Sequence, residues 1–335
     1  MQEIREWREV DAETFWRDIK PLGEPAVLRG KVGHWPVVDA GRRGPQALAD
    51  YLRPFHTRIP APFFEGPPEI GGRFFYDAAM TGFNFQARRE VLDKALDRLL
   101  QHLDDPSPPA MYAGSLSIPI FLPGFAALNP LGVFEPEVSV IESAWLGNRT
   151  VIAAHFDSTE NIACVAGGRR RFTVFPADQV RNLYMGPIDL TPAGQPISLV
   201  DIRNPDFARH PRYAEAQATG QVAELEPGDA IYIPALWWHS VEALEPLNLL
   251  INYWWRDTPA HLGSPMDALL AAALSLKDLP PHHRRGWKAL FDHLIFQEDG
   301  PPLTHLSAEV QGLLGTLTPD RAARIRAILT RNLAR

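Results

Sequence analysis

The sequence predicts a mainly β fold with flanking N-terminal helices and a helical C-terminal region. Between residues 111 and 256, apolar residues come in short strand-like runs that turn residues such as Gly, Pro, Asn and Asp separate. Many short strands at such spacing are typical of a sandwich or barrel. Of the 335 residues, 45% are hydrophobic, which is enough to form a large core and excludes a disordered chain.

The N-terminal part predicts helices and one short strand. A helix is expected over residues 11–20, with Asp11 as its cap, and a strand over residues 25–30. A second helix is expected over residues 45–52, because a proline suits the first position of a helix. Apolar residues at helical spacing predict a longer amphipathic helix over residues 86–103.

The β region is expected to form the core of the fold, over about residues 111–256. Residues 201–220 show no clear period and predict a surface insertion between strands. Strands are expected at residues 138–145, 149–155, 162–165, 171–175, 221–225, 230–233 and 249–255.

The C-terminal region predicts helices with apolar faces. We therefore expect one domain over residues 1–257 and a helical region over residues 258–335. The apolar faces must be buried, either against the β domain or in a homodimer, which is the commonest kind of oligomer. Helices are expected at residues 266–276, 284–296, 308–317 and 319–333.

Composition limits the kinds of ligand and metal site that the protein can have, and it indicates a cellular compartment. The net charge of −7 argues against broad binding of nucleic-acid phosphates. The single cysteine, Cys164, excludes a disulfide framework, a cysteine-based zinc site and an iron–sulfur cluster, so any metal must bind His, Asp and Glu. Residues 1–9 lack the apolar core of a secretion signal, and no apolar run is long enough to span a bilayer. We expect a cytoplasmic protein without a membrane segment.

Two His-x-Asp pairs are candidates for metal ligands. The pair of His102 and Asp104 lies at the end of a predicted helix, where residues two apart diverge by about 200°. The pair of His155 and Asp157 follows a strand-like run, and residues two apart on a strand point to the same face. The second pair is therefore the better candidate.

His239 supplies a third ligand of the right type. It follows a Pro-Gly-Asp turn, an apolar strand and a proline. Two histidines and one carboxylate form the facial triad of non-haem Fe(II) oxygenases, which leaves coordination positions open. The alternative for His239 alone is a buried histidine bonded to a backbone carbonyl.

Five motifs occur in an order that matches a known family. They are residues 155–157, 168–176, 204–207, 227–239 and 252–254. With them the chain resembles the JmjC/cupin-like Fe(II)- and 2-oxoglutarate-dependent oxygenases, a family that includes the asparaginyl hydroxylase of hypoxia-inducible factor and bacterial cupin-like proteins. The resemblance implies a double-stranded β-helix (jelly-roll) barrel and a catalytic Fe(II) held by His155, Asp157 and His239. It also implies 2-oxoglutarate and O₂ as cosubstrates.

The resemblance also assigns the residues around 2-oxoglutarate. Arg170 matches the basic residue that binds the distal carboxylate, which is usually Lys in similar proteins. Arginine can bind a carboxylate through two parallel hydrogen bonds, but it is longer than lysine. Tyr112 matches a tyrosine that bonds the same carboxylate, and Asn161 and Asn252 match asparagines that line the pocket. By strand alternation, Arg169 and Arg171 should face away from Arg170.

The function implied is hydroxylation of a C–H bond, most readily on a protein or peptide side chain. One alternative is an RNA or histone-tail hydroxylase or demethylase of the same family. Others are a non-catalytic cupin-like binding protein and a metal-dependent isomerase or ring-cleaving dioxygenase that needs no 2-oxoglutarate. No residue of the sequence selects among the substrates.

Overall fold

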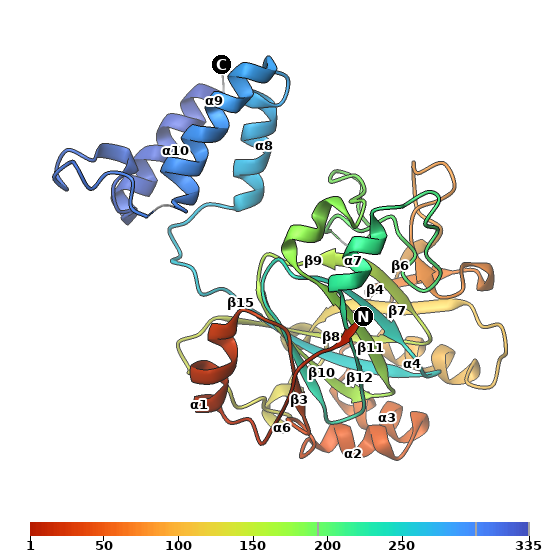
Figure 1. Ribbon diagram of the computed structural model, residues 1–335. Coiled ribbons are helices and arrows are strands. Elements are labelled where there is room, and N and C mark those ends of the chain that lie inside the picture. Colours follow the sequence, from red (N-terminus) through yellow and green to blue (C-terminus); the bar gives the residue numbers. More distant parts are fainter. Residues whose placement is uncertain (193, 299, 334–335) are drawn as a thin grey trace. The chain divides into compact units, whose positions relative to one another are not determined.

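The computed structural model describes residues 1–192, 194–298 and 300–333 (Figure 1). The chain divides into two compact units, Met1–Arg256 and Asp257–Arg335, which are described in turn. In the described part of the chain, no helix combines the length and apolar character needed to cross a membrane.

The first unit is built on two β-sheets, which confirms the predicted mainly β class. The nine-stranded sheet has the order β2-β3-β13-β10-β15-β8-β7-β4-β6, and the six-stranded sheet has the order β1-β12-β11-β14-β9-β5. Their bounds are β1 Gln2–Glu3, β2 Glu6–Arg8, β3 Ala26–Arg29, β4 Ala61–Gly66, β5 Arg73–Phe74, β6 Gln86–Glu90, β7 Ala110–Ser117, β8 Val140–Gly147, β9 Val151–Phe156, β10 Glu160–Gly167, β11 Arg170–Phe175, β12 Gln221–Leu225, β13 Ala230–Ile233, β14 Trp238–Ala243 and β15 Asn248–Trp255.

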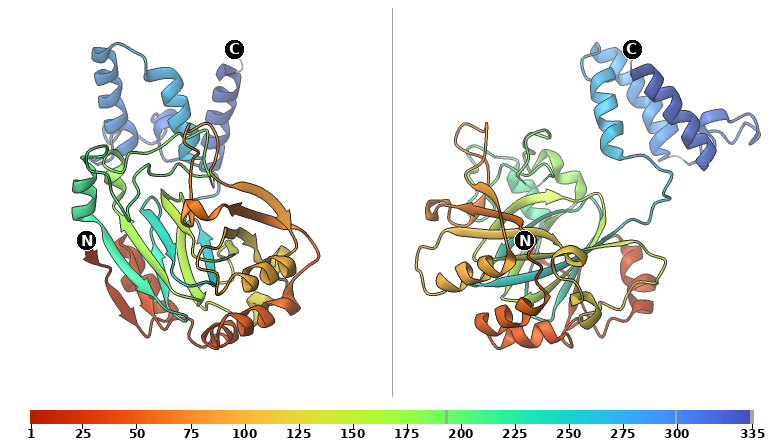
Figure 2. Two further views of the ribbon diagram at one scale, coloured as in Figure 1. Left: turned by 90° about the vertical axis from the view of Figure 1, so that its right-hand side faces the viewer. Right: turned by 180° about the vertical axis from the view of Figure 1, so that it is seen from behind.

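The eight strands from β8 to β15 wind between the two sheets. Strands β8, β10, β13 and β15 lie side by side in the larger sheet, and β9, β11, β12 and β14 lie side by side in the smaller one. The chain therefore changes sheet after almost every strand, as in a double-stranded β-helix of the jelly-roll type. Figure 2 shows the two sheets facing each other. The predicted jelly-roll is therefore present as two facing sheets, each with free edge strands.

Two apolar layers stabilise this unit, one on each side of the nine-stranded sheet. Between the sheets, Val165 and Leu250 of the larger sheet pack with Phe172 and Val241 of the smaller one. The outer layer lies beneath the N-terminal helices and contains the largest buried cluster, including Phe15, Trp35, Leu96, Cys164, Tyr232 and Trp255. The central strands of the larger sheet are thus buried on both faces, which explains the nearly continuous apolar sequence of β10 and β15.

Each expected N-terminal helix forms, apart from the start of one, and Pro36–Arg42 is a further helix that was not predicted. Asp11 accepts a hydrogen bond from the Thr14 amide at 2.8 Å and caps the first helix, as predicted. The expected start of the 86–103 helix is wrong: Gln86–Glu90 forms β6, which pairs antiparallel with β4. Hydrogen bonding to a distant strand overrides the local helical period there. The helices are α1 Ala12–Thr14, continued by a π-helix Phe15–Ile19, then α2 Pro36–Arg42, α3 Pro45–Leu52, α4 Leu92–Gln101, α5 Ile118–Phe121, α6 Phe125–Leu128 and α7 Tyr213–Thr219.

Several segments of the β region differ from the sequence expectation, and β7, α5 and α6 were not predicted. Strand β14 was not predicted, because the prolines and tryptophans before it hide its alternation, yet it lies between β11 and β9 at the middle of the smaller sheet. Residues 201–220, expected as an irregular insertion, contain the short helix α7.

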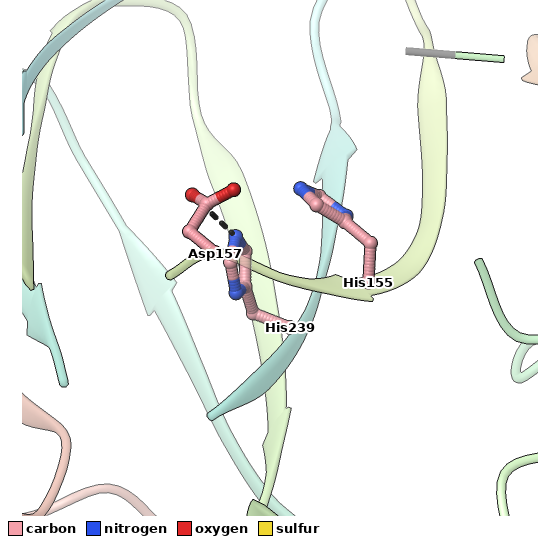
Figure 3. Close-up of side chains that lie close together, drawn as sticks. All are labelled: His155, Asp157 and His239. Carbon is pink, nitrogen blue, oxygen red and sulfur yellow. Dashed lines mark ion pairs between the residues drawn. The ribbon is translucent and has the colours of Figure 1, made fainter. Parts of the chain in front are cut away.

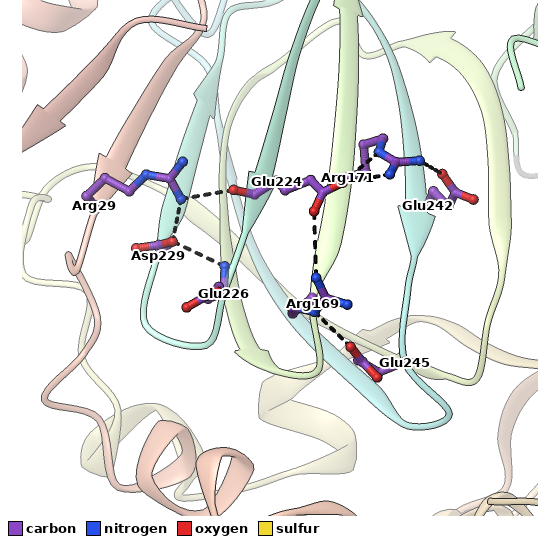
Figure 4. Close-up of polar contacts among 8 residues, drawn as sticks. All are labelled: Arg29, Arg169, Arg171, Glu224, Glu226, Asp229, Glu242 and Glu245. Atoms are coloured by element: carbon purple, nitrogen blue, oxygen red, sulfur yellow. Dashed lines mark hydrogen bonds and ion pairs between the residues drawn. The ribbon is translucent and has the colours of Figure 1, made fainter. Parts of the chain in front are cut away.

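The outer face of the smaller sheet carries a network of ion pairs (Figure 4). Arg169 bonds Glu245 at 2.8 Å, and Arg171 bonds both Glu224 and Glu242. Arg169 and Arg171 therefore point outward, as strand alternation predicts, and Arg170 points inward with only 1% of its surface exposed.

The second unit is helical. It contains α8 Pro265–Leu276, α9 Pro281–Phe291, a π-helix Asp292–Phe296 and α10 Pro319–Leu333. The expected helix over residues 308–317 is wrong, since only the 3-10 turn Gly312–Leu314 forms there. Gly312 has a φ of 60°, which is outside the helical region and ends any regular helix at that point.

Candidate functional site

The three proposed metal ligands come together from two neighbouring strands (Figure 3). His155 lies at the end of β9 and Asp157 directly after it, whereas His239 is the second residue of β14. His155 and His239 are opposite each other in the antiparallel pair of β9 and β14. One ligand atom from each of the three residues lies within 4.8 Å of the others. Two imidazoles and a carboxylate at this spacing fit the facial triad that holds Fe(II).

Backbone carbonyls orient both imidazole rings. The Nδ1 atom of His155 lies 3.0 Å from the carbonyl oxygen of Ala153, and Nδ1 of His239 lies 3.1 Å from that of Trp237. A carbonyl only accepts, so Nδ1 carries the hydrogen and Nε2 keeps its lone pair for a metal. The carbonyl partner expected for a structural His239 is therefore present, and it leaves the metal-binding nitrogen free.

Two contacts hold Asp157. The indole Nε1 of Trp254 donates to its Oδ2 atom at 3.1 Å, and the backbone amide of Leu236 donates to its carbonyl oxygen at 2.8 Å. Leu236 has a φ of 68°, in the left-handed region that non-glycine residues seldom occupy. The turn that precedes β14 is thus fixed to the loop that carries the aspartate.

The electrostatics of the triad favour a neutral His239. Burial and the neighbouring His155 lower the pKa of His239 to about 4, and only the nearby Asp157 and a backbone contact oppose this. Oδ2 of Asp157 lies 3.7 Å from Nε2 of His239. A neutral imidazole is the form that binds a metal ion.

The triad lines a cavity of about 420 Å³ between the two sheets. The smaller sheet contributes residues from β9, β11 and β14, and the larger sheet contributes residues from β7, β8, β10 and β15. All seven residues singled out from the sequence line this one cavity: His155, Asp157, His239, Arg170, Tyr112, Asn161 and Asn252.

Arg170 is a buried cation whose carboxylate partner is missing among the described residues. Its Nη2 donates a long hydrogen bond of 3.4 Å to the carbonyl oxygen of Trp145, and its Nε has no partner. Burial lowers the pKa of Arg170 and raises that of Tyr112, and each residue partly offsets the shift of the other. The indole nitrogen of Trp145, another cavity residue, is also unpaired. Buried unpaired donors are costly, so this end of the cavity is suited to an anionic ligand.

Comparison with known proteins identifies the family. A model of a family described as cupin-like domain matches residues 12–261, well over half of the chain. The chain belongs to the JmjC/cupin-like family. This confirms the resemblance found in the sequence motifs. Enzymes of this family are oxygenases and demethylases that use Fe(II) and 2-oxoglutarate.

Three relatives of this cupin-like protein illustrate the range of the family. Lysine-specific demethylase 8 of Xenopus tropicalis is 28% identical over 239 residues, which are 69% of this chain and 48% of that protein. tRNA wybutosine-synthesizing protein 5 of Danio rerio is 25% identical over 77% of both chains. HSPB1-associated protein 1 of Rattus norvegicus is 30% identical over 43% of this chain and 30% of its own. The chain thus spans about half of the first relative and less than a third of the last.

The two asparagines of the cupin-like cavity bond each other. Nδ2 of Asn252 donates to Oδ1 of Asn161 at 2.8 Å, across the neighbouring strands β10 and β15. Oδ1 of Asn252 remains without a partner. Both side chains are buried, so the free oxygen offers a hydrogen-bond acceptor to a bound ligand.

Sequence reasoning missed several residues of the cavity wall. Trp145 lies on β8 and was treated only as part of a strand, although the alternation of that strand could have placed it inside. Gln195 comes from an irregular segment, where no periodicity indicates direction. The rejected pair behaves as expected: His102 follows α4, and its Nδ1 lies 3.0 Å from Oδ2 of Asp105.

Proposed function

We propose that the protein is an Fe(II)- and 2-oxoglutarate-dependent oxygenase that hydroxylates a C–H bond. The observation that carries the proposal is the position of Arg170. A buried guanidinium with an unpaired Nε lines the same cavity as two histidines and an aspartate at metal-binding distance. The cavity therefore combines the ligands for the metal with a cationic partner for a dicarboxylic cosubstrate.

Each residue of the cavity has a defined role in this proposal. His155, Asp157 and His239 hold Fe(II), and Trp254 orients Asp157 through its indole N–H. When bound, Fe(II) supplies the activation of O₂, with 2-oxoglutarate converted to succinate and CO₂. Arg170 and Tyr112 bind the distal carboxylate of 2-oxoglutarate, and the free Oδ1 of Asn252 accepts a hydrogen bond from a bound ligand. Arg170 replaces the usual lysine and can bind the carboxylate at two points.

We propose a protein or peptide side chain as the substrate. The name of one relative, a lysine-specific demethylase, refers to an amino-acid side chain. RNA is the second candidate, because the relative named for tRNA wybutosine synthesis matches 77% of this chain. The net charge of −7 and the scattered basic residues favour the first candidate. Hydroxylation assays on peptide pools and on total tRNA, read by mass spectrometry, separate the two.

The direct test is formation of succinate from 2-oxoglutarate by the purified protein with Fe(II) and cell extract. We expect wild-type protein to form succinate and Asp157→Ala to lose at least nine-tenths of that rate. Arg170→Ala should raise the KM for 2-oxoglutarate strongly, whereas Arg169→Ala, the exposed neighbour, should not.

Three results would count against this function. No succinate with any extract would favour the non-catalytic binding protein. Unchanged activity in Arg170→Ala would favour a metal-dependent isomerase or dioxygenase without 2-oxoglutarate. Turnover that is independent of added iron would contradict the role of the triad.

We also propose that the helical unit forms a homodimer. Several large apolar side chains on its helices and loops are more than half exposed, including Leu274, Phe296 and Val310. Sedimentation velocity should show a dimer for wild-type protein and a monomer for Leu274→Glu; a wild-type monomer would refute the proposal. The cytoplasmic location expected from the single cysteine stays a prediction.

A further inference from the structure

A second cavity of about 390 Å³ adjoins the metal cavity. Six residues line both of them: Tyr112, Ser115, Trp145, Ile152, His155 and Gln195. His155, a proposed metal ligand, therefore stands in the wall between them. A group bound in the second cavity lies beside the metal site.

The remaining wall of this cavity is apolar. Pro62 and Phe64 come from β4, and Phe74 comes from β5. Phe85 directly precedes β6, and Ile197 pairs with His155 of β9. No Asp, Glu, Lys or Arg is among its described lining residues. We call it the phenylalanine cavity. The metal cavity, in contrast, is lined by Arg170 and Asp157.

The phenylalanine cavity is preformed, because its rings pack on one another. Phe85 meets Phe64 at 5.4 Å and Phe74 at 5.1 Å between ring centroids, both edge to face. The far wall is fastened to β9, since Ile197 pairs with His155 through a β-bridge. A rigid, uncharged pocket of this size binds ligands without the cost of ordering its own walls.

We propose that the phenylalanine cavity binds a neutral apolar group of the substrate, either an aromatic or a branched aliphatic side chain, beside the metal. Its link to a substrate rests on the proposed oxygenase function, whereas its preference for neutral apolar groups rests on the lining. A charged group would lose its hydration there without gaining a counter-ion. The dicarboxylic cosubstrate is expected at Arg170 for the same reason.

A cationic ligand is the alternative that the test must separate. Aromatic rings also attract quaternary ammonium groups, and such sites commonly use several ring faces. In this cavity no carboxylate lines the wall in the described residues, so the attraction would rest on the rings alone. We therefore expect a neutral aromatic probe to bind more tightly than a cationic one of similar size.

The experiment measures binding of indole and of benzyltrimethylammonium to the metal-free protein of 335 residues by calorimetry or protein NMR. Wild-type protein should bind indole at least tenfold more tightly than the cation. Phe85→Glu should weaken indole binding at least tenfold and bring the cation to equal or tighter binding. Phe85→Leu, which keeps the wall neutral, should retain indole binding within about threefold, and Phe207→Ala, a half-exposed residue outside the cavity, should leave both probes unchanged.

The inference can be tested even if one variant folds poorly, because two of the decisive measurements use wild-type protein. Absence of indole binding, binding of the cation as tight as that of indole, or indole binding unchanged in a folded Phe85→Glu protein would each overturn the inference. Because the assay needs neither iron nor turnover, its result is separate from succinate formation. Succinate formation without indole binding refutes the cavity assignment alone, and indole binding without succinate refutes the oxygenase function alone.

Discussion

Arg170 shows how one residue's direction decides the chemistry of the cavity. Successive side chains of β11 point to opposite faces, so Arg170 enters the cavity while Arg169 and Arg171 bond carboxylates outside. This alternation was readable from the sequence. The unpaired Nε of Arg170 was not, because it depends on which side chains the neighbouring strands place around it.

Two substitutions of Arg170 should show how much its charge and its two-point contact each contribute to 2-oxoglutarate affinity. Arg170→Met should weaken 2-oxoglutarate binding by about 30-fold or more, because a charge-assisted pair costs about 2–5 kcal/mol to break. Arg170→Lys should lose about tenfold, since it keeps the charge but not the two-point contact. Anaerobic calorimetric titration with Fe(II) present measures both, with Arg171→Lys as the control. Equal affinities in all variants would remove Arg170 from the cosubstrate site.

Trp254 should act on the metal through Asp157. Trp254→Phe removes the hydrogen bond to Oδ2 and keeps a large ring, so Fe(II) affinity should fall by about 10–100-fold. Trp237→Phe is the matched control, because the indole of Trp237 bonds the carbonyl of Gly23 instead. Competition with a fluorescent chelator measures the affinity, and an equal loss in both variants would point to a general effect on packing.

Glu6 should make a pH-dependent contribution to the free energy of unfolding. Its hydrogen bond with Arg29 holds the pKa of Glu6 below its ordinary 4.5. A lowered folded pKa stabilises the protein above about pH 4.5, and this contribution disappears as the pH falls through the folded value. Glu6→Gln should therefore be less stable than wild type at pH 7, by less than about 1 kcal/mol for so exposed a pair, and this difference should be smaller at pH 3. Urea unfolding at both pH values tests this against exposed Glu137→Gln, and a difference that persists at low pH would contradict it.

At the scale of elements, local pattern and long-range pairing compete. Helix α3 lies where its first-position proline predicts it, because that signal is local. Strands β6, β7 and β14 were among those not predicted, since each is stabilised by neighbours far away in the sequence. Strand β14 matters most, because it carries His239 into the site.

Two helix glycines should respond to alanine in opposite ways. A Cβ at Gly41 in α2 would lie 2.2 Å from the carbonyl oxygen of Ala166 on β10, so Gly41→Ala should cost about 1–3 kcal/mol through overpacking. Gly286 in α9 has no atom within 4 Å of such a Cβ. Gly286→Ala should stabilise its helix by about 0.5–1 kcal/mol. Calorimetric unfolding tests the pair, and a stabilised Gly41→Ala would show that α2 does not press on β10.

At the scale of the whole molecule, the two facing sheets create two adjoining cavities of different character. One combines the metal ligands with a buried cation, and the other is lined by phenylalanine rings. The sequence predicted seven residues of the first through the family resemblance. It could not predict the second, because Phe64, Phe74 and Phe85 lie in a segment rich in Pro and Gly, where only the folded chain brings the rings together.

The most direct measurement is a crystal structure of the protein grown without O₂ in Mn(II) and 2-oxoglutarate. We predict one Mn(II) bound by His155, Asp157 and His239, with the distal carboxylate of 2-oxoglutarate against Arg170 and the phenylalanine cavity free of it. A metal bound elsewhere, or 2-oxoglutarate that makes no contact with Arg170, would contradict the proposed site.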